Sequence, residues 1–147
     1  MTPVDPGLHY PIDLKALPVG WDVCYVGDRI PDIQPGFASG IHNQEGKGIP
    51  HLRPMNISRQ GNIELVVVKS VADTSGPRLR RGDVLFNNTN SSELIGKTAA
   101  VDVDEPWAFS NHMTRLRPPA SILGKFIAQQ LHFVWMSGYF KDHVEVR

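Results

Sequence analysis

The chain has 147 residues, 41% of them hydrophobic and 20% charged, and its formal net charge is zero. This length and composition predict one globular domain that buries a core without disulfides or metals. Zero net charge argues against a protein that binds polyanions through its overall charge alone. Cys24 is the one cysteine, which excludes an internal disulfide and predicts a reducing, bacterial-type cytoplasm. No apolar run is long enough to span a bilayer, so no membrane partner is expected.

The first half of the chain predicts an arm, two strands and a long loop. Residues 1–16 are rich in proline and read as an arm before a domain over 17–147, with no charged start and apolar core typical of a secretory signal. Residues 17–30 alternate Trp21, Val23 and Tyr25 with polar positions, which predicts a strand with one buried face. Residues 31–50 hold four glycines and three prolines and are expected to form a loop. The β-branched run over 63–69 predicts a central strand.

The second half predicts shorter strands and one helix. A turn at Gly82 and Asp83 leads into a strand over 83–86, and the segments 97–101, 107–110 and 112–117 follow. Residues 118–140 predict a helix with Ser121 as N-cap and Gly138 as its stop. One helical face carries the apolar residues Ile122, Phe126, Ile127, Leu131, Val134 and Trp135. A helix docked on a sheet, and hence an α/β fold, is the prediction.

Known catalytic and metal-binding motifs are absent. The six histidines and Cys24 form none of the spacings typical of zinc sites, and no phosphate-binding glycine loop or nucleophile elbow occurs. Cys24 stands in an apolar alternation that favours a buried structural thiol. Asp102, Asp104 and Glu105 could bind magnesium or do acid–base work, but such clusters are more often exposed turns. The sequence therefore predicts a binding module and not an enzyme.

Two polar segments are candidates for DNA binding. Residues 87–92 hold three Asn, one Thr and two Ser, with Arg80, Arg81 and Lys97 on either side. Asn can bind the adenine edge bidentately, and cations can bind phosphates, so such a loop could read bases between two phosphate contacts. Residues 46–63 repeat the pattern with Lys47, Arg53 and Arg59. On composition alone a plain turn is the favoured explanation of the loop, because Asn and Ser are turn residues.

The ordered set of motifs resembles a known family. "LPVGWDVCYVGD", "GIPHLRPMNISRQGNI", "LRRGDVLFNNTNSSELIGKTAAV", "FSNHMTRLRP" and a helix ending in "GYF" are similar, in this order, to a target recognition domain of the DNA-specificity (S) subunit of type I restriction–modification systems. The resemblance covers residues 17–140. It departs from the family at Asn90, where a glycine is usual, and in having no helical spacer after the helix.

The resemblance implies a non-catalytic reader of one half of a bipartite double-stranded DNA site. It implies an α/β (α+β) unit with a twisted, partly barrel-like mixed sheet. Methyltransferase (M) and restriction (R) subunits would be its partners, and S-adenosylmethionine, the methyl donor for DNA methylation, would be bound by the M subunit and not by this chain. A second recognition domain, or a second copy of the chain, would read the other half-site.

The expected DNA contacts combine the two polar segments with positions that match the family's motifs. Arg53 and Asn56 match a recurrent polar pair, and Asn111 and His112 stand where a strand of the family begins. The full set is Lys47, His51, Arg53, Asn56, Ser58, Arg59, Arg80, Arg81, Asn87, Asn88, Thr89, Asn90, Ser91, Ser92, Lys97, Asn111, His112, Arg115 and Arg117. Two alternatives stay open, a protein-interaction module that binds no nucleic acid and a magnesium-dependent hydrolase that uses the acidic cluster.

Overall fold

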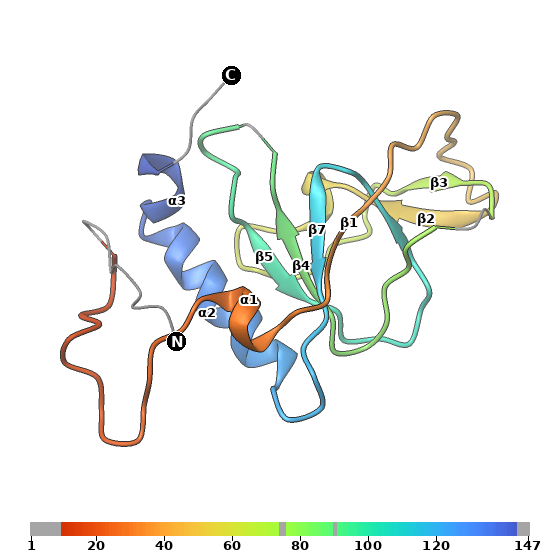
Figure 1. Cartoon of the computed structure of the whole chain (residues 1–147). Helices are drawn as coiled ribbons and strands as arrows, with labels where there is room; N and C mark the ends of the chain where they lie inside the picture. Colours follow the sequence, from red (N-terminus) through yellow and green to blue (C-terminus); the bar gives the residue numbers. More distant parts are fainter. Residues whose placement is uncertain (1–9, 74–75, 90, 144–147) are drawn as a thin grey trace.

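The computed structural model describes residues 10–73, 76–89 and 91–143, and it shows two small β-sheets with helices on one side (Figure 1). The predicted α/β class with a packed C-terminal helix is confirmed. The strands form two sheets and not a closed barrel. Most of the predicted arm, residues 1–9, lies outside the described residues, and residues 10–16 contain no helix or strand. None of the helices in the described ranges has the length and apolar character needed to cross a membrane.

The first sheet has the strand order β1-β7-β4-β5, and its neighbouring strands are all antiparallel. Its strands are β1 (Ile33–Pro35), β4 (Val84–Asn87), β5 (Thr98–Ala100) and β7 (Met113–Leu116). Side chains alternate between the two faces of β4, because successive residues of a strand point to opposite sides. Leu85 belongs to a core shared with the second sheet, whereas Val84 and Phe86 belong to a core shared with the C-terminal helix.

The second sheet has the strand order β3-β2-β6. It packs against the first sheet around the core that contains Leu85. It contains β2 (Ile49–Leu52), β3 (Lys69–Val71) and β6 (Ala108–Phe109). β2 is antiparallel to β3 and parallel to β6. The short 3-10 helix η1 (Pro54–Asn56) follows β2. Leu52 and Phe109 are fully buried here, so the end of β2 is fixed against the core.

The long helix α2 (Gly124–Met136) lies across β4 and β5 and leads into α3 (Tyr139–Asp142), while the short helix α1 (Val26–Arg29) precedes the first sheet (Figure 1). Its first residue has no side chain for a physical reason. A Cβ on Gly124 would lie 2.1 Å from the carbonyl oxygen of Gly82, so only glycine lets the helix start approach the turn before β4 this closely.

Two predicted strands are wrong. Residues 17–25 form no strand, Trp21 and Tyr25 are exposed, and the chain instead forms α1, whose start is fixed by the Asp28 carboxylate accepting from the Tyr25 N–H. Within 63–69, only Lys69 belongs to a strand, and Leu65, Val66 and Val67 are exposed. In both places a locally favourable pattern lacks a neighbouring strand to bond it, which is what β-propensity requires. The predicted loop over 31–50 is also corrected, since it contains β1 and the start of β2.

The remaining segments agree better with prediction. The strands expected over 83–86 and 97–101 are confirmed as β4 and β5, and the segments 107–110 and 112–117 contain β6 and β7. The helix is confirmed but shorter, with Leu123 and not Ser121 as its N-cap, and Gly138 at a positive φ ends it. Phe126, expected on the buried face, is exposed, while Ala128 and His132 are buried. Cys24 is half-buried and not fully buried.

Candidate nucleic-acid interface

Two connections and the end of β2 meet at one end of the first sheet. The backbone N–H of Asn88, in the β4–β5 loop, donates to the carbonyl of His112 in the β6–β7 turn (2.9 Å). The Asn88 amide also donates to the Thr114 hydroxyl (2.7 Å). The Ser110 N–H donates to the carbonyl of Leu52 (2.8 Å), which places Arg53 next to this turn.

We call the side chains that the three segments present here the loop face. Ser91, Asn111 and His112 are exposed, and the others are half-buried. Its members are Arg53, Asn88, Thr89, Ser91, Ser92, Asn111 and His112. Asn90, also expected here, lies outside the described residues. The structure thus brings together polar residues that are about 60 positions apart in the sequence.

Asn87 gives the loop its shape and is itself buried. Its side-chain oxygen accepts from the Thr89 N–H (2.9 Å), and its amide donates to the carbonyl of Leu94 (2.9 Å). These two bonds close the loop on itself, as Asn side chains do in turns. Asn87 is therefore a structural residue that supports the loop face from below.

The loop face offers the hydrogen-bonding groups that base edges require. Asn carries both a donor and an acceptor, Ser and Thr hydroxyls can act as either, and Arg donates in a planar fork. Such groups bind the donor and acceptor pattern of bases in the major groove. One cation among neutral groups is a composition better suited to reading bases than to binding phosphates alone.

Other residues expected to contact DNA are buried and already have partners. The His51 Nε2 donates to the carbonyl of Phe37 (2.8 Å), and the Asn56 amide donates to the carbonyls of Glu64 and Val67 (both 2.9 Å). The Ser58 hydroxyl accepts from the Asn62 N–H (3.1 Å). The buried residues of the expected set are His51, Asn56, Ser58, Asn87, Lys97 and Arg115. Because their polar atoms face the interior, they support the surface and do not form it.

Lys97 is the least expected of these buried groups. Its ammonium donates to the carbonyls of Ile57 (2.6 Å) and Pro54 (3.3 Å), so it ties the turn after η1 to the start of β5. Burial lowers the pKa of Lys97, the nearby charge of Arg59 lowers it further, and Glu64 opposes both. Arg59 is exposed and lies close to Lys97, so it remains a candidate phosphate contact.

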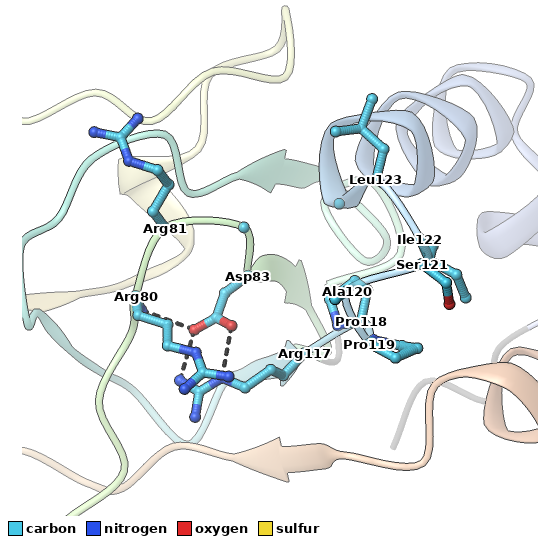
Figure 2. A pocket seen from close by; sticks show the side chains of 12 residues that line it. Arg80, Arg81, Asp83, Arg117, Pro118, Pro119, Ala120, Ser121, Ile122 and Leu123 are labelled. Carbon is cyan, nitrogen blue, oxygen red and sulfur yellow. Dashed lines mark hydrogen bonds and ion pairs between the residues drawn. The ribbon is translucent and has the colours of Figure 1, made fainter.

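Most of the other expected cations lie at the opposite end of the first sheet (Figure 2). Arg117 forms a two-point ion pair with the buried carboxylate of Asp83 (Nε–Oδ1 2.8 Å, Nη2–Oδ2 2.9 Å), and this hydrogen bonding raises the pKa of Arg117. Arg81 lies 3.2 Å from Asp104 and 3.6 Å from Asp102. The length of β4, about 13 Å for four residues at 3.3 Å each, separates this end from the loop face.

Pairing with aspartates neutralises the charge at this end. Arg115 pairs with Asp32 (3.0 Å) and Arg78 with Asp73 (2.9 Å). A cation whose charge is already matched by a carboxylate attracts phosphate weakly. Arg80 is exposed at the same end, and Lys47 lies elsewhere, paired with Glu45 (2.8 Å). These residues were grouped with the polar loop by sequence distance, and the fold does not place them beside it.

The acidic cluster forms no metal site in the described part of the chain. Asp102 and Asp104 both face Arg81. Within the described ranges, no group of three or more His, Cys, Asp or Glu side chains is arranged to hold a metal ion. The acidic residues thus act as counter-charges for an arginine here.

An apolar groove runs along α2 on another side of the molecule. It has a volume of about 630 Å³. Leu65, Val103 and Trp107 line one side, and Leu123, Phe133 and Met136 of the helix region line the other. Leu123 and Met136 are strongly exposed. Val66, which follows Leu65 in the sequence, is strongly exposed as well. Exposed apolar surface of this kind often marks a protein-binding site.

Two residues of the interface region had no signal in the sequence. Ser39 accepts a hydrogen bond from the Arg53 guanidinium (2.7 Å), a contact across 14 positions. Met55 is exposed in η1, two residues after Arg53. Only the path of the chain between β1 and β2 brings Ser39 to Arg53, and no local pattern encodes that path.

The buried His51 predicts a pH dependence of stability. Burial lowers the pKa of His51 below its ordinary 6.5; the bond to Phe37 opposes this shift, and the charges of Arg53 and His42 reinforce it. As pH falls below 6.5, the unfolded chain binds a proton that the folded chain does not, so stability should fall until the pH passes the folded pKa. His51→Gln should reduce the loss of unfolding free energy between pH 7.5 and 5.5, measured by urea denaturation. The exposed His112→Gln is the control and should keep the wild-type loss; equal losses in all three proteins would contradict the prediction.

Comparisons with known proteins identify the fold. No family model matches the chain, and no curated protein matches it. Several solved structures do, among them the following two. One, described as "Structural basis underlying complex assembly and conformational transition of the type I R-M system", has 22% identity, a TM-score of 0.62 and coverage of 81% of this chain. The other, the HsdS subunit from Thermoanaerobacter tengcongensis, has 19% identity, a TM-score of 0.62 and coverage of 88%.

The chain has the fold of a type I target recognition domain. The resemblance that the sequence motifs suggested is therefore confirmed at the level of fold. The match covers 29% and 31% of the two longer chains, so this chain corresponds to less than a third of either. In the recognition fold described above, the loop face is the surface where polar connections from both sheets converge.

Proposed function

We propose that this chain recognises double-stranded DNA and reads one half of a bipartite site, as a recognition domain of a type I specificity subunit does. The observation that carries the proposal is the convergence of three polar segments on the loop face, in a chain with the recognition fold. Residues 17–147 form the recognition domain in this proposal, with 1–16 as an arm. Asp102 and Asp104 of the acidic cluster pair with Arg81, which supports a non-catalytic role.

The proposal assigns the chemistry to partner subunits. Methylation and cleavage would be performed by M and R subunits, and the M subunit would bind S-adenosylmethionine. This chain would act in the bacterial cytoplasm, where it would direct those subunits to their site. A second recognition domain or a second copy of the chain would supply the other half-site.

Selection from randomised duplexes tests the proposal. The full chain is incubated with a duplex pool at low salt, and the retained DNA is sequenced. We expect enrichment of a short motif and an affinity that falls with salt, by about 0.9 log units per log unit of salt for each phosphate contact. Failure to retain any duplex at low salt, with or without an M subunit, would refute DNA recognition.

A pair of asparagine variants separates reading from folding. Asn111→Ala removes an exposed amide from the loop face, and we expect it to relax the motif at one position by about 1–3 kcal/mol. Asn62→Ala removes an exposed amide beside the α2 groove and should leave the motif unchanged. Equal losses on every sequence for Asn111→Ala would contradict direct readout at this residue.

Protein binding is a second candidate function, favoured by the groove along α2. Its apolar rim resembles surfaces that accept an amphipathic helix. We expect Met136→Glu to weaken a complex with a type I M subunit, measured by size-exclusion chromatography, without changing DNA binding. Lys141→Glu, which makes the exposed surface of α3 more negative by a larger step, is the control for added negative charge. Retention of the complex by Met136→Glu would argue against this groove as the docking surface.

A further inference from the structure

Arg53 differs from the other arginines that the described structure buries or half-buries. Arg78, Arg115 and Arg117 each form an ion pair with an aspartate at 2.8–3.0 Å. Among the described residues, Arg53 has no carboxylate partner, and its guanidinium makes one side-chain hydrogen bond, to the hydroxyl of Ser39. Its Nε is buried and has no hydrogen-bond partner, a property that it shares with the Nε of Arg115. Arg53 therefore carries an uncompensated charge and an unused donor on the loop face.

An unpaired donor at such a place has an energetic cost. A buried N–H without a partner loses its bonds to water and gains nothing in return. Burial lowers the pKa of Arg53, which shows that the surroundings disfavour its positive charge. The cost to the charge would be reduced by a ligand that brings acceptor atoms to the guanidinium, so the site favours binding of such a ligand.

The backbone under Arg53 is held rigidly. Its N–H donates to the side-chain oxygen of Asn56 (2.9 Å), whose amide is fixed by two further bonds to backbone carbonyls. Its carbonyl accepts from the Asn56 N–H (2.8 Å). Because Leu52 before it is bonded to Ser110 and fully buried, the guanidinium projects from a fixed point.

The segment that carries Ser39 is held as well. The Phe37 N–H donates to the carbonyl of Phe109 (3.0 Å), and the carbonyl of Phe37 accepts from His51 (2.8 Å). The rings of Phe37 and His51 meet edge to face, with centroids 5.2 Å apart. Ser39, two residues after Phe37, is therefore held close to β2 and β6 of the second sheet and restricts the rotamers open to Arg53, which reduces the entropy lost on binding.

We propose that Arg53 is the principal DNA-contacting cation of the loop face and that Ser39 is the residue that positions it. The inference rests on the proposed function and names the chemistry at its centre, a pair of acceptor atoms bound by the guanidinium fork. Two parts of DNA present such a pair. One is the O6 and N7 edge of guanine in the major groove, and the other is a backbone phosphate.

Two substitutions of Arg53 distinguish these sources. Lysine keeps the charge but loses the planar fork, and glutamine loses both. If the ligand is guanine, Arg53→Lys and Arg53→Gln should both lose preference for one G·C pair in the selected motif, by roughly 10- to 100-fold. If it is phosphate, Arg53→Lys should bind almost as the wild type does. Arg53→Gln should then weaken binding to all sequences and reduce the salt slope by about 0.9.

The positioning role of Ser39 is tested by DNA-binding measurements that a change in stability alone would not alter. Ser39→Ala should reduce whichever quantity Arg53→Gln reduces, the base preference or the salt slope, by a smaller factor. Ser39→Thr keeps a hydroxyl at this position and should therefore retain the wild-type value of that quantity. The Arg53 Nε–H resonance in the ¹⁵N NMR spectrum of the full chain should shift when the selected duplex is added. Arg80→Gln, an exposed arginine at the opposite end of the sheet, is the control and should change none of these.

The outcomes that overturn the inference differ from those that overturn the proposed function. If the wild type binds DNA, and a folded Arg53→Gln keeps its affinity, motif and salt slope, Arg53 is not the contact and the inference fails alone. A wild type that retains no duplex refutes both. Circular dichroism and thermal melting check that each variant folds. If a variant does not fold, the NMR experiment on the wild type decides instead. An Arg53 resonance that does not change when the duplex is added overturns the inference.

Discussion

Asp83→Asn is expected to lower the free energy of unfolding by about 3 kcal/mol. Asp83 is 0% exposed, accepts two hydrogen bonds from Arg117 and accepts a third from the Arg80 N–H (2.8 Å). Asparagine keeps the shape and one oxygen but leaves the largely buried Arg117 without its counter-charge. Removing one member of a buried ion pair typically costs 3–5 kcal/mol. Urea denaturation at neutral pH measures the change.

A second aspartate at the same end of the sheet provides the control. Asp104 pairs with Arg81 at 3.2 Å, but its side chain is 78% exposed. Exposed pairs contribute about 0–1 kcal/mol because water and salt screen them, so Asp104→Asn should change stability little. Losses of similar size in the two variants would show that the Asp83–Arg117 pair is not the internal support that its geometry indicates.

Asn56→Ala is expected to destabilise the chain by about 3 kcal/mol, although the sequence suggested Asn56 as a DNA contact. Its side chain makes three hydrogen bonds, all to backbone groups, from the Arg53 N–H and to the carbonyls of Glu64 and Val67. Alanine leaves these groups without partners, and each buried unpaired group costs roughly 1–3 kcal/mol. Thermal and urea unfolding measure the loss.

The control for Asn56 is an exposed asparagine in the same connection. Asn62→Ala should change stability by less than about 0.5 kcal/mol, as substitutions at exposed sites usually do. If Asn56→Ala were as stable as the wild type and instead lost preference at one base pair, Asn56 would be a base-reading residue after all. The two results cannot be confused, because one is a change in unfolding and the other a change in motif.

Local patterns were sufficient for elements whose neighbours lie close in sequence. The turn at Gly82 and Asp83, the strands β4 and β5 and the helix α2 follow from short runs of residues. The β4–β5 pairing joins residues only 12 to 16 positions apart. Elsewhere the same reasoning failed. The run over 63–69 has the β-branched side chains of a strand. However, the carbonyls of Glu64 and Val67 accept hydrogen bonds from the Asn56 amide, and Leu65, Val66 and Val67 are exposed.

The residues of the candidate site also fall into two groups, those that the sequence placed correctly and those that it did not. Composition alone pointed to the polar loop, and Asn88, Thr89, Ser91 and Ser92 do lie on the loop face. Composition could not separate cations that face solvent from cations that serve the interior. Lys97 bonds carbonyls 40 and 43 positions away, and Arg115 pairs with an aspartate 83 positions away. Burial of a charge depends on such distant partners, so no local window of sequence reveals it.

The sequence by itself determined the class of the fold: an α/β chain with a polar loop between two strands and a C-terminal helix. These properties are local, since side-chain periodicity and turn residues act over a few positions. The tertiary structure alone decided which polar residues share a surface. It gathered Arg53, Asn88 and Asn111 at one end of a sheet and neutralised Arg81 and Arg117 at the other. The reason is physical, because hydrogen bonds and ion pairs between distant segments form only after the core has fixed the strands that carry them.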